Sequence, residues 1–316
     1  FFVNSHSFNS KLNHYFYCMI KKAVLAIVDF LLFSNLFIAS CAVAQGLVTY
    51  YLLRVPADKY VLAFLFCSTL LIYNLSMLLS KPKEPQKSPF KRVRWIFSHH
   101  RLTISITLIA ALCIIPLSLW YLSIQSKLLM GFVGALALAY NFPFLNFNDK
   151  KIGLRNLPGI KLFLIGFVWS VSCVLLPIVQ IESTFGIMIS LSETLLLVAK
   201  RFLFICAITI PFDIRDLYQD KLYELKTIPV ILGEKKAWIF CQALLVVYVI
   251  MLVLFTKEIN PQVIGLVLTV VLTGWLIFKS NIKKNEYFYF LFLDGTMLLQ
   301  WLIVYLTLFI GRAPLF

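Results

Sequence analysis

The sequence predicts an all-α, polytopic membrane protein built from nine transmembrane helices. Of its 316 residues, 61% are hydrophobic and only 14% are charged, whereas a soluble domain carries about 25% charged residues. Nine apolar runs are each close to the length of about 20 residues that crosses the hydrocarbon core of a bilayer. Lys and Arg residues collect in alternate loops between these runs. Together, the three observations indicate one helical bundle in a membrane.

The nine spans follow one another with short connections. We place them at 31–53, 60–80, 103–123, 128–145, 160–180, 194–214, 237–256, 261–279 and 287–310. Residues 1–22 are polar and rich in aromatic residues, and Met19-Ile20-Lys21-Lys22 has the character of a natural start. We therefore expect residues 1–22 to be an N-terminal extension outside the fold. Residues 23–316 are expected to form a single transmembrane domain.

The distribution of positive charge tests this count and gives an orientation. Of the 29 Lys and Arg residues, 22 lie before the first span or in the loops after the second, fourth, sixth and eighth spans. By the positive-inside rule, these segments face the cytoplasm. The N-terminus is then cytoplasmic and the C-terminus non-cytoplasmic, which requires an odd number of helices. We interpret the chain as a multi-pass protein of a bacterial inner membrane.

Composition also bears on the expected partners. The net charge of +15 does not indicate nucleic-acid binding, because the basic residues occupy loop positions typical of topology signals and contacts with anionic headgroups. Six of the seven cysteines lie in apolar spans without a C-x-x-C pair, so they are interpreted as small buried hydrophobes. The expected partners are membrane lipids and lipophilic molecules.

Three aspartates directly follow the apolar part of the sixth span, where a helix would meet water. Asp213, Asp216 and Asp220 are spaced i, i+3, i+7, which on a helix places them on one face. Like charges on neighbouring turns repel, and a helix C-terminus disfavours negative charge, so a compensating cation is expected. Oxygen ligands suit Mg²⁺, which commonly bridges carboxylates to phosphates. The alternative is a solvated acidic helix end, neutralised by Arg215, Lys221 and Lys226.

The same stretch resembles a known motif. Asp-x-x-Asp-x-x-x-Asp, followed by Lys226-Thr227-x-Pro229 and Leu232-Gly233, is similar to the second aspartate-rich motif of the UbiA-type intramembrane prenyltransferases. The resemblance implies a UbiA-like bundle with a cavity that opens towards the cytoplasm. It also implies transfer of a prenyl group from a polyprenyl diphosphate to a lipophilic acceptor, such as an aromatic compound or quinone precursor. In that family the three aspartates are catalytic and bind Mg²⁺.

The resemblance extends to the fourth and fifth spans. Tyr140-Asn141-Phe142-Pro143 is similar to the Tyr-x-x-Pro end of the family's fourth helix. The segment 153–158, running into Lys161 and Trp169, is similar to the region between helices four and five. This implies that Arg155 and Lys161 help to hold the diphosphate and that Tyr140 lies in the substrate site. Further candidates to bind its oxygens are Arg215, Lys221 and Lys226. Without the resemblance, these basic residues are topology signals or headgroup contacts.

The family's first aspartate-rich motif, on the second helix, is degenerate in this chain. Asn74 matches its leading asparagine and is expected near the diphosphate, but Leu75, Leu78 and Pro82 stand where its carboxylates should be. Two interpretations remain. Lysines of the loop 81–101 can replace the charge of a second ion, which leaves a Mg²⁺-dependent prenyltransferase. Alternatively, the protein is a catalytically inactive UbiA-fold protein that acts as a lipid-binding or scaffold partner.

Overall fold

The computed structural model describes residues 4–141, 145–147, 150–152, 159–222, 225–256 and 260–310. In chain order its helices are α1 (Asn4–Phe33), α2 (Leu36–Leu53), α3 (Lys59–Leu79), η1 (Pro85–Lys87), α4 (Lys91–Ser98), α5 (His100–Pro116), η2 (Leu117–Tyr121), α6 (Ile124–Asn141), α7 (Ile160–Ser170), η4 (Val171–Leu175), α8 (Leu176–Phe185), α9 (Leu191–Arg215), α10 (Leu217–Leu222), α11 (Ile228–Leu232), α12 (Glu234–Leu254), α13 (Pro261–Lys279), η5 (Phe288–Leu293) and α14 (Gly295–Ile310). A two-stranded antiparallel hairpin, β1 (Leu145–Phe147) and β2 (Lys150–Ile152), stands between α6 and α7.

In the described residues, nine apolar helical segments correspond to the nine predicted spans. Eight are long and apolar enough to cross a membrane, namely Leu36–Leu53, Lys59–Leu79, His100–Tyr121, Ile160–Phe185, Leu191–Arg215, Glu234–Leu254, Pro261–Lys279 and Phe288–Thr307; the ninth, Ile124–Tyr140, is shorter. Helices suit this environment because they satisfy their own backbone hydrogen bonds. The all-α, multi-pass prediction is confirmed, with one short hairpin added, whereas the orientation of the termini stays a prediction.

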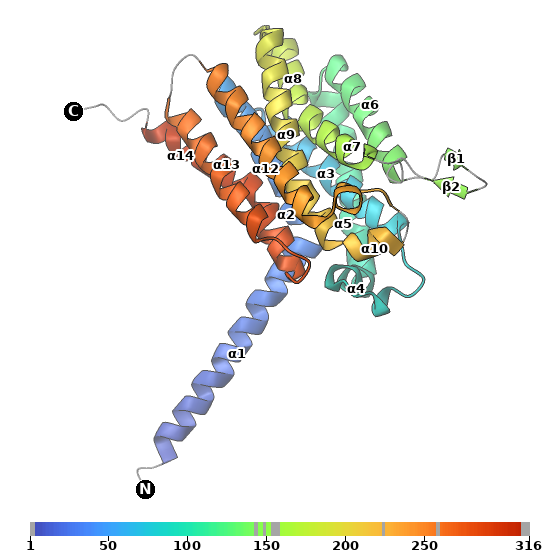
Figure 1. The fold of residues 1–316 in the computed structure, drawn as a ribbon, viewed down its shortest axis with the longest axis vertical. Coiled ribbons are helices and arrows are strands. Elements are labelled where there is room, and N and C mark those ends of the chain that lie inside the picture. The colour runs from blue at the N-terminus through green and yellow to red at the C-terminus, as the bar shows by residue number, and fades with distance from the viewer. Residues whose placement is uncertain are drawn as a thin grey trace.

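The first predicted span, 31–53, is divided in the structure. The break falls at Ser34 and Asn35, where Asn35 adopts a left-handed φ of 68°, a conformation that asparagine tolerates better than most residues. α1 ends before this break and α2 begins after it. Figure 1 shows α1 projecting from one end of the bundle, and its residues 16–27 are exposed or only partly buried. That residues 1–22 lie outside the fold stays a prediction.

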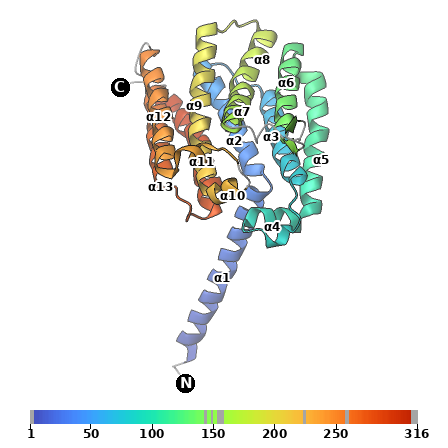
Figure 2. The same cartoon turned by 45° about the vertical axis from the view of Figure 1, so that its right-hand side comes forward.

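The spans form a closed ring of packed helices. Following the contacts, α2 packs on α3, α3 on α6, α6 on α7, and α7 on α9; α12, α13 and α14 then lead back to α2. α5 flanks α3 on the outside, and α8 extends α7 through the π-helical turn η4. Figure 2 shows α2 inside the bundle, between α9 and α3. This arrangement surrounds a central space with helices from both halves of the chain.

The short polar segments gather at one end of the bundle. Figures 1 and 2 both place α4 and α10 at the end from which α1 projects. The chain leaves α3 at Leu79 and becomes α-helical again only at Lys91, because Pro82, Pro85 and Pro89 disfavour a continuous helix there. α10 follows the C-terminus of α9 directly. The residues predicted to carry chemistry therefore approach this end from several elements.

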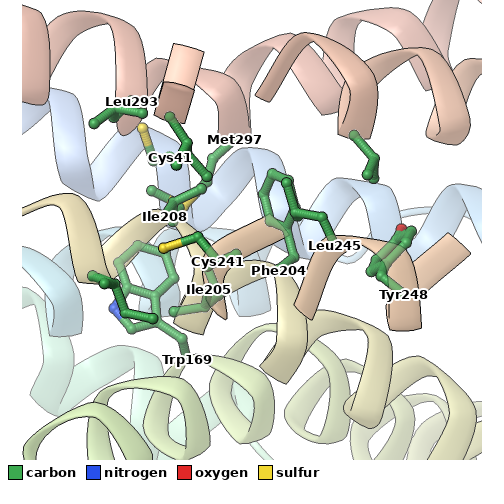
Figure 3. Close-up of a cluster of buried hydrophobic side chains, with 14 of the residues drawn as sticks. Cys41, Trp169, Phe204, Ile205, Ile208, Cys241, Leu245, Tyr248, Leu293 and Met297 are labelled. Atoms are coloured by element: carbon green, nitrogen blue, oxygen red, sulfur yellow. The ribbon is translucent and has the colours of Figure 1, made fainter. Parts of the chain in front are cut away.

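A hydrophobic core supports the central space. Its largest cluster joins buried side chains of α2, α7, α9, α12, α13 and α14. Figure 3 shows Trp169, Ile205 and Ile208 at one end of this cluster, away from Leu245 and Tyr248. The same three residues line a cavity at the polar end of the bundle. The core and the cavity therefore share a wall, and close packing of that wall limits how its side chains can move.

Candidate functional site

A cavity of about 220 Å³ opens at the polar end of the bundle. It is lined by residues from the α1–α2 junction, α3, α4, α7, α9, η5 and α14. Six charged residues are among them: Arg92, Lys161, Asp213, Arg215, Asp216 and Asp294. Charged side chains around a partly enclosed space are costly to desolvate unless they form ion pairs or bind a charged ligand. The cavity is the candidate functional site.

Asp213 forms an ion pair with a cation from another helix. It lies in the last turn of α9 and is only 2% exposed. Lys161, in the first turn of α7, places its Nζ 2.5 Å from Asp213 Oδ1. A carboxylate near a helix C-terminus is unfavourable by itself, and the ammonium compensates. The cation beside Asp213 is thus supplied by a residue 52 positions away in the chain; whether Asp213 binds Mg²⁺ stays a prediction.

Asp216 is paired with its neighbour in the chain. Arg215 Nε and one of its NH₂ groups donate to the two carboxylate oxygens of Asp216, at 2.7 and 3.0 Å. The guanidinium also lies 5.2–5.3 Å from the ring centroids of four aromatic residues, which are Phe90, Phe212, Tyr289 and Phe290. Such cation–π contacts and a two-point carboxylate contact fix the plane of an arginine. Arg215 is thus held rigidly at the cavity.

Asp220 departs from the predicted arrangement. The spacing predicted one helical face for the three aspartates, but α9 ends at Arg215, Asp216 is its C-cap, and Asp220 lies on the separate helix α10. Asp220 accepts a hydrogen bond of 3.1 Å from the hydroxyl of Thr227. Burial raises the pKa of Asp220, Lys161 opposes this change, and the nearby charges of Asp213 and Asp216 add to it. The three carboxylates are therefore electrostatically coupled but do not share one helix.

The other predicted site residues do not line the charged cavity in the described part of the chain. Lys221 and Lys226 are exposed and do not line the cavity. Tyr140 lines a neighbouring apolar pocket. Asn74 is fully buried behind the cavity wall. Its Oδ1 accepts a hydrogen bond of 2.6 Å from Nδ2 of Asn35, which belongs to that wall. Arg155 lies outside the described residues. Their part in substrate binding stays a prediction.

Sequence reasoning missed two residues of the cavity wall. Arg92 belongs to a basic run of the loop 81–101 that reads as a topology signal, and Asn35 lies where the first apolar span was drawn without a break. In the structure, one NH₂ group of Arg92 donates to Asn35 Oδ1 at 2.5 Å. The available signal was weak: a polar Ser-Asn pair within an apolar run, which marks a helix boundary.

Carboxylates that suit Mg²⁺ line the cavity on the α9 side and at Asp294 of the last span, and α3 offers none. Asp213 and Asp216 line the cavity and offer hard oxygen ligands, with Asp220 coupled to them. Across the described ranges, no three Asp, Glu, His or Cys side chains converge as a complete metal cage. Mg²⁺ commonly takes one or two carboxylates and completes its shell with water and phosphate oxygens. The residues thus fit one ion shared with an anionic ligand; on α3, Leu75 and Leu78 provide no ligand.

Two apolar pockets adjoin the charged cavity. Their volumes are about 200 and 300 Å³, and α3, α6 and α7 supply lining residues to both. All three spaces share Tyr73 and Trp169. These two residues touch each other: Trp169 Nε1 donates to the Tyr73 hydroxyl at 3.3 Å, and their rings are 83° apart. The site therefore joins a charged compartment to an apolar one across a pair of aromatic side chains.

Comparison with known proteins identifies the fold. No protein-family model and no curated protein matches the sequence. A UbiA homologue from Archaeoglobus fulgidus, solved with GPP and Mg²⁺ bound, is similar with a TM-score of 0.62 and 11% identity, over 88% of this chain and 99% of that one. The apo structure of a UbiA homologue from Aeropyrum pernix K1 is also similar, with a TM-score of 0.58 and 16% sequence identity, over 89% of this chain and 97% of that one.

A structure described for digeranylgeranylglyceryl phosphate synthase in membranes is also similar. Its TM-score is 0.53 with 16% identity, over 90% of this chain and 98% of that chain. These similarities cover nearly the whole of each solved structure. The chain therefore has the fold of the UbiA homologues, as the resemblance implied.

Proposed function

We propose that this chain, which has the fold of the UbiA homologues, is a membrane prenyltransferase that moves a prenyl group from a polyprenyl diphosphate to a lipophilic acceptor. One observation carries the proposal: the charged cavity adjoins two apolar pockets at Tyr73 and Trp169. A prenyl diphosphate has the matching chemistry, with an anionic head and a hydrocarbon tail. Two of the similar solved structures were obtained with GPP or DMAPP together with Mg²⁺.

The head group would lie among the charged residues. Asp213, Asp216 and Asp220 would hold Mg²⁺, while Lys161 and Arg215 would meet diphosphate oxygens that the ion does not reach. When bound, Mg²⁺ supplies charge neutralisation to the diphosphate. Because Lys161 and Arg215 are already fixed by their carboxylate partners, they need little reorganisation to meet a developing anion.

The reaction breaks one bond and forms another. The bond between the first prenyl carbon and its diphosphate oxygen breaks, and the electron pair leaves with the diphosphate. An electron pair of the acceptor then forms a bond to that carbon, and the acceptor loses a proton to water or to a base. The apolar wall formed by Trp169, Ile205 and Ile208 excludes water from the carbon, which limits hydrolysis.

The tail pockets give a test of substrate binding. Ala137 is 9% exposed and lines both apolar pockets. Ala137→Trp is expected to weaken retention of geranylgeranyl diphosphate at least about tenfold, because the indole fills space that the tail would occupy. Retention of inorganic pyrophosphate should stay within twofold. The control is Leu128→Trp on the same helix, where the side chain is 69% exposed. Equal retention of geranylgeranyl diphosphate by the Ala137 variant would contradict the assignment of the tail pockets.

A second function is favoured by one specific observation. The α3 side of the cavity has no carboxylate, since Leu75 and Leu78 occupy positions at which the resemblance implies metal ligands. A site that binds one ion neutralises less leaving-group charge than a site with two. The alternative function is therefore a UbiA-fold protein that binds prenyl diphosphate or lipid without transfer.

One experiment separates the two functions. Full-length protein in lipid nanodiscs is supplied with Mg²⁺, geranylgeranyl diphosphate and a set of quinone-precursor acceptors, and release of pyrophosphate is followed over time. A prenyltransferase releases pyrophosphate and forms a prenylated acceptor in equal amounts. Retention of geranylgeranyl diphosphate without release, with every acceptor, would favour the non-catalytic alternative. Omission of Mg²⁺ is the control for the metal.

A further inference from the structure

The last span carries an acidic side chain that the proposed reaction does not use. Asp294 is the only charged residue of the span Phe288–Thr307, and it lines the charged cavity. It stands at the junction of η5 and α14, directly after a π-helical turn. Such turns interrupt the regular spacing of a helix and are frequent at functional sites. An acidic residue inside a span is costly, so a function for it is the default expectation.

The backbone of Asp294 is held in place, whereas its carboxylate is not clamped to a cation. The backbone N–H of Asp294 donates to the carbonyl of Tyr289 at 3.1 Å, and its own carbonyl accepts a hydrogen bond from the thiol of Cys41 at 3.4 Å. In the described part of the chain, the ion pairs within 4.0 Å are Lys87–Glu84, Lys91–Asp29, Lys161–Asp213 and Arg215–Asp216. Asp294 is in none of them. Its charge therefore belongs to the cavity as a whole.

Two arginines provide the counter-charge of Asp294 through space. Arg92 and Arg215 act electrostatically on Asp294, and all three residues line the cavity. The two guanidinium carbons lie 4.8 and 5.2 Å from the ring centroid of Phe290, which precedes Asp294 by four residues. Asp294 is not grouped with the aspartates of α9, since no three Asp, Glu, His or Cys side chains converge among the described residues. Its nearest electrostatic partners are therefore cations.

The cavity is close to neutral because of Asp294. The described residues that line it include three basic and three acidic side chains. Two of the acids, Asp213 and Asp216, are in direct ion pairs with Lys161 and Arg215. Without the third acid, the wall would carry a net positive charge. Charges a few ångströms apart in a partly enclosed space interact strongly enough to change the affinity for an anion about tenfold or more.

We propose that Asp294 is a specificity-determining residue whose carboxylate repels a diphosphate that arrives without a metal ion, and so makes binding at the cavity depend on Mg²⁺. This inference rests on the proposed function and deepens it. The repulsion from Asp294 increases with the negative charge of the ligand. Mg²⁺ neutralises part of that charge, so a metal-bound diphosphate is repelled less than a free one. A diphosphate product that loses its ion is then expelled from the site.

The test measures binding of inorganic pyrophosphate by full-length protein in nanodiscs, by calorimetry, with Mg²⁺ and in buffer depleted of divalent ions. Asp294→Asn keeps the size of the side chain and removes its charge. Its affinity without Mg²⁺ should rise at least about tenfold, whereas its affinity with Mg²⁺ should change less than about threefold. The matched control is Asp294→Glu, which keeps the charge and should keep the parent's ratio of the two affinities. A variant that fails to fold cannot produce tighter binding.

Asp216→Asn distinguishes repulsion of the anion from binding of the metal. Asp216 and Asp294 both line the cavity, so each substitution removes one carboxylate from the same wall. The proposed function assigns Asp216 to Mg²⁺, and its loss should weaken the binding of pyrophosphate measured with Mg²⁺. Asp294→Asn should keep that binding, because the charge it removes opposes the anion and holds no ion. The two variants therefore differ in the presence of Mg²⁺.

Each outcome bears on the role of Asp294. Parent-like affinity of Asp294→Asn without Mg²⁺ would overturn it while leaving prenyl transfer possible, and so would an equal gain in both conditions. Loss of affinity with Mg²⁺ would overturn it in favour of a metal ligand at Asp294. A parent protein that binds pyrophosphate equally well with and without Mg²⁺, or not at all, would also overturn it. If Asp294→Asn gains affinity only without Mg²⁺ but the parent transfers no prenyl group to any acceptor, the role of Asp294 stands and the proposed transferase activity fails.

Discussion

Asp216→Asn is expected to slow release of pyrophosphate from geranylgeranyl diphosphate at least about 100-fold, which corresponds to about 2.7 kcal/mol of transition-state stabilisation. The carboxylate lines the cavity and is one of two there that the α9 segment offers to Mg²⁺. Its replacement by an amide removes a charged oxygen ligand, and metal-dependent stabilisation of a leaving group contributes several kcal/mol. Mg²⁺-dependent retention of the diphosphate should also weaken tenfold or more. Asp220→Asn should weaken this retention similarly.

The structure adds a signature that simple misfolding would not produce. In Asp216→Asn, Arg215 loses its carboxylate partner but stays held by four aromatic rings. The freed guanidinium of Arg215 should keep or strengthen the binding of pyrophosphate measured without Mg²⁺. The additional binding that depends on Mg²⁺ should be lost. Glu193→Gln is the matched control, since Glu193 is an exposed carboxylate at the opposite end of the same helix. Equal Mg²⁺-dependent retention in Asp216→Asn and the parent would favour a solvated acidic helix end.

The second large effect concerns stability. Lys161→Met is expected to lower the free energy of unfolding by about 3–5 kcal/mol, because it leaves the buried Asp213 carboxylate without its ammonium partner. The measurement is denaturant unfolding of the protein in detergent micelles, followed by tryptophan fluorescence. Lys221→Met is the control, since Lys221 is exposed and an exposed lysine contributes little.

A double substitution tests the physical cause. Lys161→Met combined with Asp213→Asn removes both charges, so most of the lost stability should return even though the hydrogen bond is changed. If the double variant is as unstable as Lys161→Met, the loss comes from packing around the lysine rather than from an uncompensated carboxylate. If Lys161→Met is as stable as the parent, the pair contributes nothing measurable.

Much of the fold was predictable from the sequence because the bilayer imposes simple requirements. Hydrocarbon thickness sets the length of each apolar run, and backbone hydrogen bonding in lipid requires each run to be helical. The nine spans follow from these two constraints. The break at Asn35 was missed because the apolar composition continues on both sides of it. The break at Asp216 was missed because i, i+3, i+7 spacing is compatible with a continuous helix whether or not one forms.

The sequence by itself determined the nine-helix bundle and marked Asp213, Asp216 and Asp220, because apolar run length and adjacent carboxylates are local properties of the chain. Only the tertiary structure decided which cations meet those carboxylates. Lys161 reaches Asp213 across 52 positions, and Arg92 reaches Asn35 across 57. The physical reason is that neither the composition of the chain nor the position of a loop distinguishes one loop lysine or arginine from another. Helix packing alone selects which of them leave water and face the cavity.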